Sequence, residues 1–198
     1  MVVNAAATET MTDHGAFCLR EDTGTSSLEQ TARSVAEVLC HHGIAHLIVG
    51  GLALQEHGYY RTTTDVDVVV GDVFEAVDVL TADLSGPFRP ITGRQDGVRD
   101  RRNDAVVDVL PGGQVVKAGC KVPFPMPTEV TDRPKVVGLP DLISLKLDSW
   151  ANSPTNRLKD KADVVELIKA RTLPRDFAVL PQVRLHYEET WDALKAEV

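Results

Sequence analysis

The run Asp-Val-Asp-Val-Val-Val at residues 65–70 constrains the fold more than any other stretch of this sequence. Its β-branched residues, followed by a glycine, predict a buried strand over 66–70. Residues i and i+2 of a strand lie on the same face, with their Cα atoms about 6.5–7 Å apart. Asp65 and Asp67 therefore direct two carboxylates to one side, while Val66 points into the core. Two carboxylates this close repel each other, and a hard divalent cation would remove that repulsion.

A third carboxylate is predicted from a later apolar stretch. Asp108 lies between valines in a strand expected over 105–110. If that strand lies next to the first one, Asp108 would complete a clamp for two metal ions about 3.5–4 Å apart. Asp104 is a nearby competitor for this place, but Asp108 has the better strand context.

A glycine pair predicts a phosphate-binding turn, which would complement the metal site. Gly50 and Gly51 follow a strand predicted over 46–49 and precede a short helix predicted over 52–57. Glycines at such a turn let the backbone approach a phosphate closely, and the N–H groups at the start of the helix then face an anion. Phosphates held by backbone and metals held by carboxylates are typical of phosphoryl or nucleotidyl transfer.

The remaining periodicity predicts a mixed α/β front half and a helical back half. Residues 1–25 show neither period and are expected to form a flexible leader, followed by a catalytic core over 26–138 and a helical part packed on it over 139–198. Prolines at 123, 125, 127, 134 and 140 exclude a helix there, so extended chain or an edge strand is expected. Further elements are predicted as helices over about 26–42, 72–84, 140–150, 156–169 and after 174, and as a strand over 88–91 joined to 105–110 by a polar, Arg-rich connection.

Composition excludes several classes of protein. The net charge of −8, from 29 acidic and 21 basic residues, argues against general duplex-DNA binding. No run approaches the roughly 18 apolar residues that a membrane span needs, and the N-terminus lacks the pattern of a secretory signal. The three cysteines are widely spaced without a metal-binding pattern, which predicts reduced thiols and a cytoplasmic protein.

These motifs resemble those of a known group of enzymes. Gly-Gly, a gap of thirteen residues and Asp-Val-Asp at 50–67, with the later Asp108, is similar to the pattern of the nucleotidyltransferase superfamily. The longer string Gly-Gly-Leu-Ala-Leu-Gln-Glu-His-Gly-Tyr-Tyr-Arg-Thr-Thr-Thr-Asp-Val-Asp resembles its minimal prokaryotic branch, related to AbiEii-type abortive-infection toxins. Lys146, followed by Arg-Leu-Lys-Asp-x-x-Asp at 157–163, is similar to the helical signature of that branch. The resemblance implies an α+β fold, with a polymerase-beta-like core of mixed sheet and helices plus a helical C-terminal part.

Carried over residue by residue, the resemblance also implies roles. Asp65, Asp67 and Asp108 would hold two Mg²⁺ or Mn²⁺ ions, with Asp108 also a candidate general base. Lys146 matches a lysine that contacts the triphosphate, and it is counted among the catalytic residues. The candidate nucleotide- and phosphate-binding residues are Gly50, Gly51, Arg61, Thr64, Lys146 and Asp160.

The implied activity is transfer of a nucleoside monophosphate from a nucleoside triphosphate, ATP for example, to a hydroxyl of RNA (tRNA) or protein. A toxin–antitoxin or phage-defence setting, with a cognate antitoxin, is part of this hypothesis. Two alternatives stay open: a catalytically silent module that binds nucleotide or a partner, and a metal-dependent phosphoesterase. At the level of single residues, Lys146 could instead extend to the surface, and Arg157, Asp160 and Asp163 could form ordinary helical ion pairs. The arginines of 89–102 could bind RNA or a protein substrate near the third carboxylate, but a solvated loop is the favoured interpretation.

Overall fold

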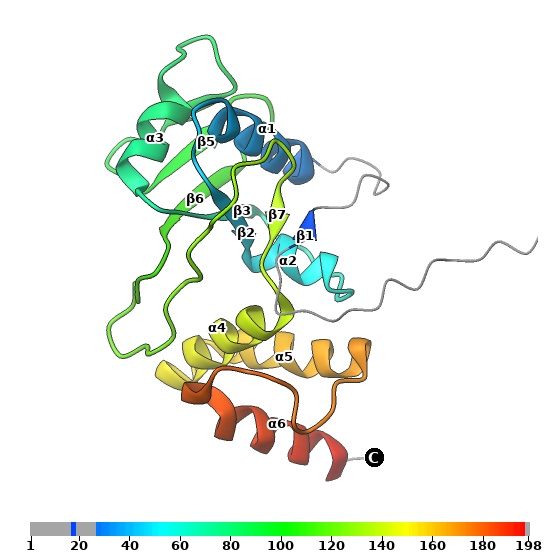
Figure 1. Ribbon diagram of the computed structural model, residues 1–198. Coiled ribbons are helices and arrows are strands. Elements are labelled where there is room, and N and C mark those ends of the chain that lie inside the picture. Colours follow the sequence, from blue (N-terminus) through cyan, green and yellow to red (C-terminus); the bar gives the residue numbers. More distant parts are fainter. Residues whose placement is uncertain (1–16, 19–26, 197–198) are drawn as a thin grey trace, which may run out of the picture.

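The computed structural model describes residues 17–18 and 27–196, which form a mixed α+β fold (Figure 1). Its helices are α1 (Ser27–His41), α2 (Gly50–Glu56), α3 (Val73–Thr81), α4 (Leu139–Asn152), α5 (Leu158–Arg171) and α6 (Arg184–Ala196), with a 3₁₀ turn, η1 (Pro181–Val183). Its strands are β1 (Phe17–Cys18), β2 (His46–Val49), β3 (Asp65–Val70), β4 (Phe88–Pro90), β5 (Gly97–Asp100), β6 (Val106–Pro111) and β7 (Lys135–Val136). None of the helices in this part of the chain is long and apolar enough to cross a membrane.

The described strands form one mixed sheet in the order β1-β7-β2-β3-β6-β5-β4. At its centre β3 runs antiparallel to β2 and parallel to β6. The parallel register places Asp67 opposite Asp108. Because paired residues of neighbouring strands point to the same face, this register decides that the third carboxylate joins the first two.

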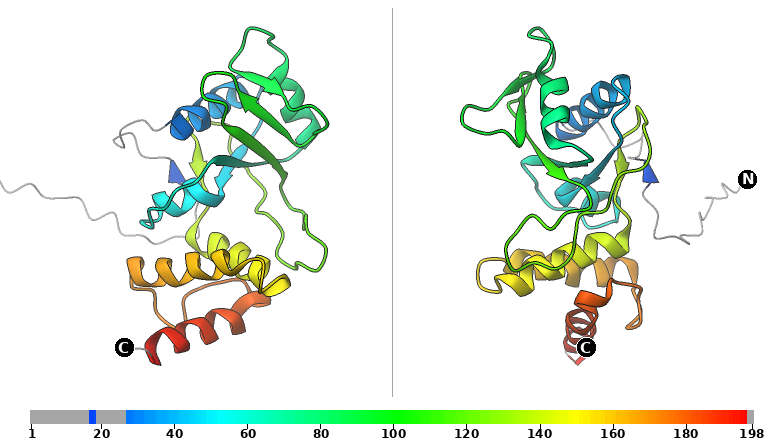
Figure 2. Two further views of the ribbon diagram at one scale, coloured as in Figure 1. Left: turned by 180° about the vertical axis from the view of Figure 1, so that it is seen from behind. Right: turned by 60° about the vertical axis from the view of Figure 1, so that its left-hand side comes forward.

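Helices α1 and α3 cover one face of the sheet (Figure 2). They contact each other, and between them they contact β2 to β6. Of the apolar stripe predicted for this helix, Ala32, Val35, Ala36 and Leu39 are fully buried there, and Leu28 is partly buried. The valines at 66, 68 and 70, which alternate with the two aspartates of β3, are fully buried as well. The apolar side of β3 thus belongs to the core, which leaves its aspartate side for other contacts.

The C-terminal helices pack together beside the sheet, as Figure 1 shows. Helix α4 packs along α5 and also touches α2, while α6 contacts both α4 and α5. Tyr187 of α6 is fully buried, and its hydroxyl donates a hydrogen bond to the carbonyl of Pro174 at 2.8 Å. The helical C-terminal part predicted from the sequence is therefore present, and α4 is the helix that faces the core.

The structure departs from the sequence-based expectations in three places. Most of the expected leader lies outside the described residues, but Phe17–Cys18 form a strand that pairs antiparallel with β7. Helix α2 begins at Gly50 itself, two residues earlier than expected. Strand β5 lies within the Arg-rich connection and pairs with both β4 and β6. It was missed because its stability comes from backbone pairing on both sides, whereas its side chains are largely polar.

Candidate active site

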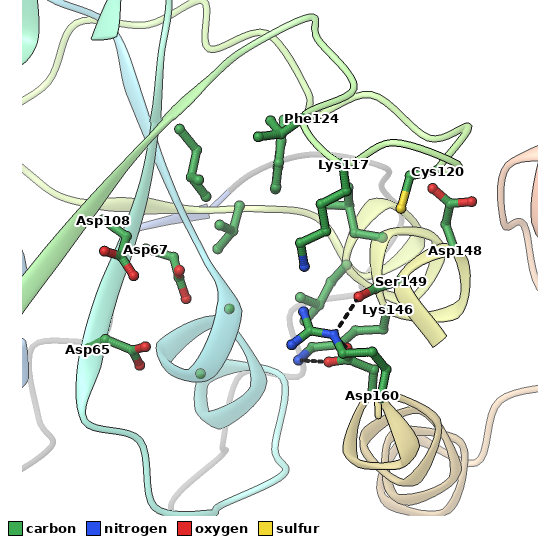
Figure 3. Close-up of a pocket in the computed structure, with 18 of the residues that line it drawn as sticks. Asp65, Asp67, Asp108, Lys117, Cys120, Phe124, Lys146, Asp148, Ser149 and Asp160 are labelled. Carbon is green, nitrogen blue, oxygen red and sulfur yellow. Dashed lines mark hydrogen bonds and ion pairs between the residues drawn. The ribbon is translucent and has the colours of Figure 1, made fainter. Parts of the chain in front are cut away.

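Three aspartates form a cluster on one face of the sheet. Asp65 and Asp67 come from β3, and Asp108 comes from the neighbouring β6. One carboxylate oxygen from each lies within 4.8 Å of the other two, so the three are placed to hold metal together. Figure 3 shows all three side chains directed toward the same cleft. The strand periodicity predicted the pair, and the parallel register of β3 and β6 adds the third member.

Asp67 is the aspartate of this cluster with a clearly perturbed environment. Burial, followed by the neighbouring charges of Asp65 and Asp108, raises the pKa of Asp67 to about 6, while Lys146 and Lys117 act in the opposite direction. A divalent cation among the three carboxylates would offset the repulsion that raises this pKa. The donors are all carboxylate oxygens, which are the ligands that Mg²⁺ and Mn²⁺ prefer. The residues present therefore fit the expected metal.

The glycine pair lies directly against these carboxylates. Gly50 has φ of +68°, and a Cβ atom on it would stand 1.9 Å from Oδ2 of Asp67. A Cβ on Gly51 would stand 2.2 Å from Oγ1 of Thr63. The hydroxyl of Thr63 in turn donates a hydrogen bond to Oδ1 of Asp65 at 2.9 Å. The glycines thus let the turn between β2 and α2 fit against the aspartate cluster, in addition to the phosphate contact expected of them.

The competitor for the third carboxylate lies elsewhere. The side chain of Asp104 is 70 % exposed and pairs with Arg89 at 2.8 Å. It also has a positive φ of 65°, typical of a turn residue. Asp104 is not a member of the aspartate cluster, whereas Asp108 is.

Arg94 is an unexpected member of the site. Its guanidinium lies 2.8 Å from Oδ1 of Asp108 and 2.8 Å from Oδ1 of Asp96. Of the arginines interpreted as a solvated loop, this one reaches the aspartate cluster. The sequence does not distinguish it from the other arginines of this stretch, because its contact with Asp108 depends on how the connection between β4 and β5 folds back over the sheet. In the metal-free protein it supplies part of the positive charge that a cation would otherwise provide.

The aspartates line one wall of a cleft of about 450 Å³. The opposite wall is built from α4, the start of α5 and the connection between β6 and β7, and Figure 3 shows Lys117, Lys146 and Asp160 on that side. Gly50 and Gly51 lie between the two walls and also line the cleft. Carboxylates on one wall and lysines on the other suit an anionic ligand that reaches the carboxylates through bound cations and contacts the lysines directly.

Three of the predicted site residues, Arg61, Lys146 and Asp160, meet Arg157 and Asp163 in an ion-pair network on the second wall. Nζ of Lys146 lies 2.8 Å from Asp160 and 2.7 Å from Asp163. Arg61 binds Asp163 through two hydrogen bonds, of 2.8 and 3.0 Å. Arg157 contacts Asp160 at 2.9 Å. The side chain of Lys146 is only 13 % exposed, so it points into the site rather than to the surface.

This network fixes the protonation of Asp160. Burial acts to raise the pKa of Asp160, but the charge and hydrogen bond of Lys146 prevail and hold the pKa below its ordinary value. Lys146 thus forms ion pairs with Asp160 and Asp163 at the same time. Lys146 and Arg61 stand in the site as expected, but as partners of aspartates.

The cleft contains Thr63, which was not predicted as a site residue, and not Thr64, which was. Thr64, predicted to bind nucleotide, is exposed and is not among the cleft residues, whereas Thr63 lines the cleft. Thr63 precedes Asp65 by two residues, so the period of an extended chain already places the two on one side. That signal would have identified Thr63. Lys117 also lines the cleft without having been predicted, since nothing in the local sequence around it marks a site.

Comparison with known proteins bears on the fold. No protein-family model matches the sequence, and no curated protein matches it at a significant level. Among solved structures the chain is similar to an antigenic nucleotidyltransferase-like protein from Paracoccidioides brasiliensis, with a TM-score of 0.53 and 18 % identity over 92 % of this chain and 95 % of that one. The chain has a nucleotidyltransferase-like fold. A weaker likeness connects the chain with ANT(2")-Ia in complex with adenylyl-2"-tobramycin, at a TM-score of 0.48 and 11 % identity over 85 % of this chain and 97 % of that one.

Proposed function

We propose that this protein is a metal-dependent nucleotidyltransferase that transfers a nucleoside monophosphate from a nucleoside triphosphate to a hydroxyl group. The observation that carries the proposal is the meeting of Asp65, Asp67 and Asp108 within 4.8 Å on one wall of a cleft. The nucleotidyltransferase-like fold agrees with it. In this reaction the acceptor oxygen forms a bond to the α-phosphorus, the bond from that phosphorus to the bridging oxygen breaks, and pyrophosphate leaves.

The three aspartates would bind Mg²⁺ or Mn²⁺, two ions in the full complex. Bound ions of this kind neutralise charge on the phosphates and favour an in-line displacement. Asp108 is the candidate to accept the proton of the acceptor hydroxyl, because it belongs to the cluster and its side chain is 26 % exposed toward solvent. Gly50 and Gly51 would offer backbone N–H groups to phosphate from the first turn of α2.

The opposite wall would hold the rest of the triphosphate. Lys146 is the proposed phosphate ligand there, with Arg61 and Asp160 in supporting roles through the ion-pair network described above. A bound triphosphate would draw the ammonium of Lys146 partly away from its two aspartates. Because Asp163 stays paired with Arg61 through two hydrogen bonds, that shift leaves no isolated buried charge.

The acceptor and the biological setting belong to the same proposal. The resemblance of 50–67 and 146–163 to the AbiEii-related branch supports a tRNA or a protein hydroxyl as the acceptor, in a toxin–antitoxin or phage-defence system. Lys146, Asp160 and Asp163 belong to one ion-pair network, which supports the interpretation that the residues of that helical signature act together. A cognate antitoxin would then be a protein partner, and the site would work in the cytoplasm.

The test uses each of the four nucleoside triphosphates, labelled at the α-phosphate, with Mg²⁺ or Mn²⁺ and either total RNA or a cell lysate. We expect label in a macromolecule and release of pyrophosphate. Asp67→Asn should abolish both, while Asp104→Asn, which changes an exposed aspartate outside the cluster, should leave them unchanged. Tight binding of metal and nucleotide without transfer to any acceptor would favour the silent module. Cleavage of a phosphodiester without added nucleotide would favour the phosphoesterase.

A further inference from the structure

The cations of the cleft differ in whether they already have partners. Six lysines and arginines line it, and four of them form ion pairs with carboxylates: Arg61, Arg94, Lys146 and Arg157. Within residues 17–18 and 27–196, Lys117 and Lys159 have no carboxylate at ion-pairing distance. A triphosphate brings several negative charges, and a lysine without a partner can meet them without first giving up an ion pair.

The side chain of Lys117 is directed into the cleft. Figure 3 shows its side chain extending into the cleft from the connection between β6 and β7, across from Asp67 and Asp108. Its charge is also close enough to act on Asp67. Lys117 therefore faces the space between the aspartate cluster and α4.

The segment that follows Lys117 is fastened to helix α4 at two points. Oδ2 of Asp148 accepts hydrogen bonds from the backbone N–H groups of Lys121, at 2.8 Å, and Val122, at 2.9 Å. Nδ2 of Asn152 donates to the carbonyl of Ala118 at 3.0 Å. Asp148 is only 6 % exposed, and a buried carboxylate that accepts two backbone hydrogen bonds is a firm anchor.

A close backbone approach supports the same attachment. Gly119 has φ of +87°, and a Cβ atom on it would stand 2.1 Å from Oδ1 of Asn152. A glycine at this position lets the chain turn against the end of α4. The residue two positions before it is Lys117, so the attachment fixes where that lysine enters the cleft.

We propose that Lys117 binds the phosphate chain of the nucleotide from the wall opposite the three aspartates, and that Asp148 and Asn152 hold its segment in place for this purpose. The inference rests on the proposed function and deepens it by adding a phosphate ligand from outside the known motifs. Lys117 and Lys146 of the second wall then bind phosphate in different ways. Lys117 binds the phosphates without breaking an ion pair, whereas Lys146 must first leave its two aspartates.

The test is binding of inorganic tripolyphosphate and of a non-hydrolysable nucleoside triphosphate, each with Mg²⁺, measured by calorimetry on the full chain. Lys117→Ala should weaken both by about tenfold, which is the effect of one charge-assisted hydrogen bond. Lys117→Arg should recover most of the affinity. Lys121→Ala is the matched control, because it removes the same charge from the same segment, outside the cleft, and keeps the backbone N–H that Asp148 binds. Melting curves check that each variant is folded.

The outcomes separate the inference from the function on which it rests. If the wild-type protein binds neither tripolyphosphate nor nucleotide with Mg²⁺, the proposed function fails and the inference fails with it. If the wild type binds both and Lys117→Ala binds both equally well, the inference alone is overturned. Loss of nucleotide binding with unchanged tripolyphosphate binding would also overturn it, because Lys117 would then contact the nucleoside.

Discussion

Gly50 and Asp67 occupy adjoining space so closely that a Cβ atom on the glycine would lie 1.9 Å from Oδ2 of the aspartate. The glycine also has φ of +68°, a conformation that other residues rarely adopt. Two independent constraints therefore require glycine at the turn beside the carboxylates. This relationship makes the position of Asp67, a proposed metal ligand, depend on the glycine of the turn that was interpreted as a phosphate-binding motif.

Gly50→Ala should destabilise the protein and weaken its metal binding. The left-handed conformation alone costs about 1–2 kcal/mol, and the displacement of Asp67 should add roughly 1–3 kcal/mol of overpacking. Gly43→Ala is the matched control, since Gly43 has φ of +73° but a Cβ atom on it would meet nothing within 4 Å. Urea unfolding and Mn²⁺ titration of both variants measure the difference. Equal losses in the two would show that the contact with Asp67 is unimportant.

Asp67→Asn should stabilise the metal-free protein at neutral pH. The pKa of Asp67 is raised to about 6, so the folded state prefers the protonated acid and loses stability as the pH rises through about 6. The variant removes this loss, and we expect a gain on the order of 1–3 kcal/mol at pH 7.5 that vanishes below about pH 4. Millimolar Mg²⁺ should raise the melting temperature of the wild type and leave that of the variant unchanged. A variant that unfolds without metal would instead show that the carboxylate is structural.

Asp108→Asn and Asp104→Asn should differ sharply in metal binding. Asp108 belongs to the cluster, whereas Asp104 is exposed and pairs with Arg89. Loss of a metal carboxylate should reduce Mn²⁺ affinity by at least about tenfold, equivalent to ~1.4 kcal/mol, and the Asp104 variant should match the wild type. Asparagine tolerates the positive φ at 104 well, so that control should fold normally. The reverse result would place the third ligand at Asp104.

Lys146→Met should cost stability as well as activity. Its ammonium lies between Asp160 and Asp163, and the side chain of Asp163 is 1 % exposed. Removing one partner of such a buried pair costs about 3–5 kcal/mol, although Arg61 and Arg157 should reduce that figure here. Adding Asp163→Asn to the variant should therefore cost less than the sum of the two single changes. Lys161→Met, which removes a lysine lying 4.3 Å over the ring of Trp150, is the control in urea unfolding. Additive costs would argue against the network.

The fold and the site were predictable to different degrees. The amphipathic stripe of α1 and the alternation along β3 are local patterns, so the sequence predicted both elements and the shared face of Asp65 and Asp67. Strand β5 escaped prediction because neighbours that are distant in the sequence stabilise it through backbone hydrogen bonds. The same local rule that found the two aspartates would have identified Thr63 in place of Thr64.

By itself, the sequence determined that two carboxylates project together from a buried strand, because that follows from the period of an extended chain. The tertiary structure decided which aspartate joins them, since the register of β3 with β6 sets Asp108 opposite Asp67. It also decided that Arg94 reaches this cluster and that Lys146 is held between two buried acids. These contacts connect segments that lie far apart in the sequence. Such segments meet only through tertiary packing, which local sequence patterns do not predict.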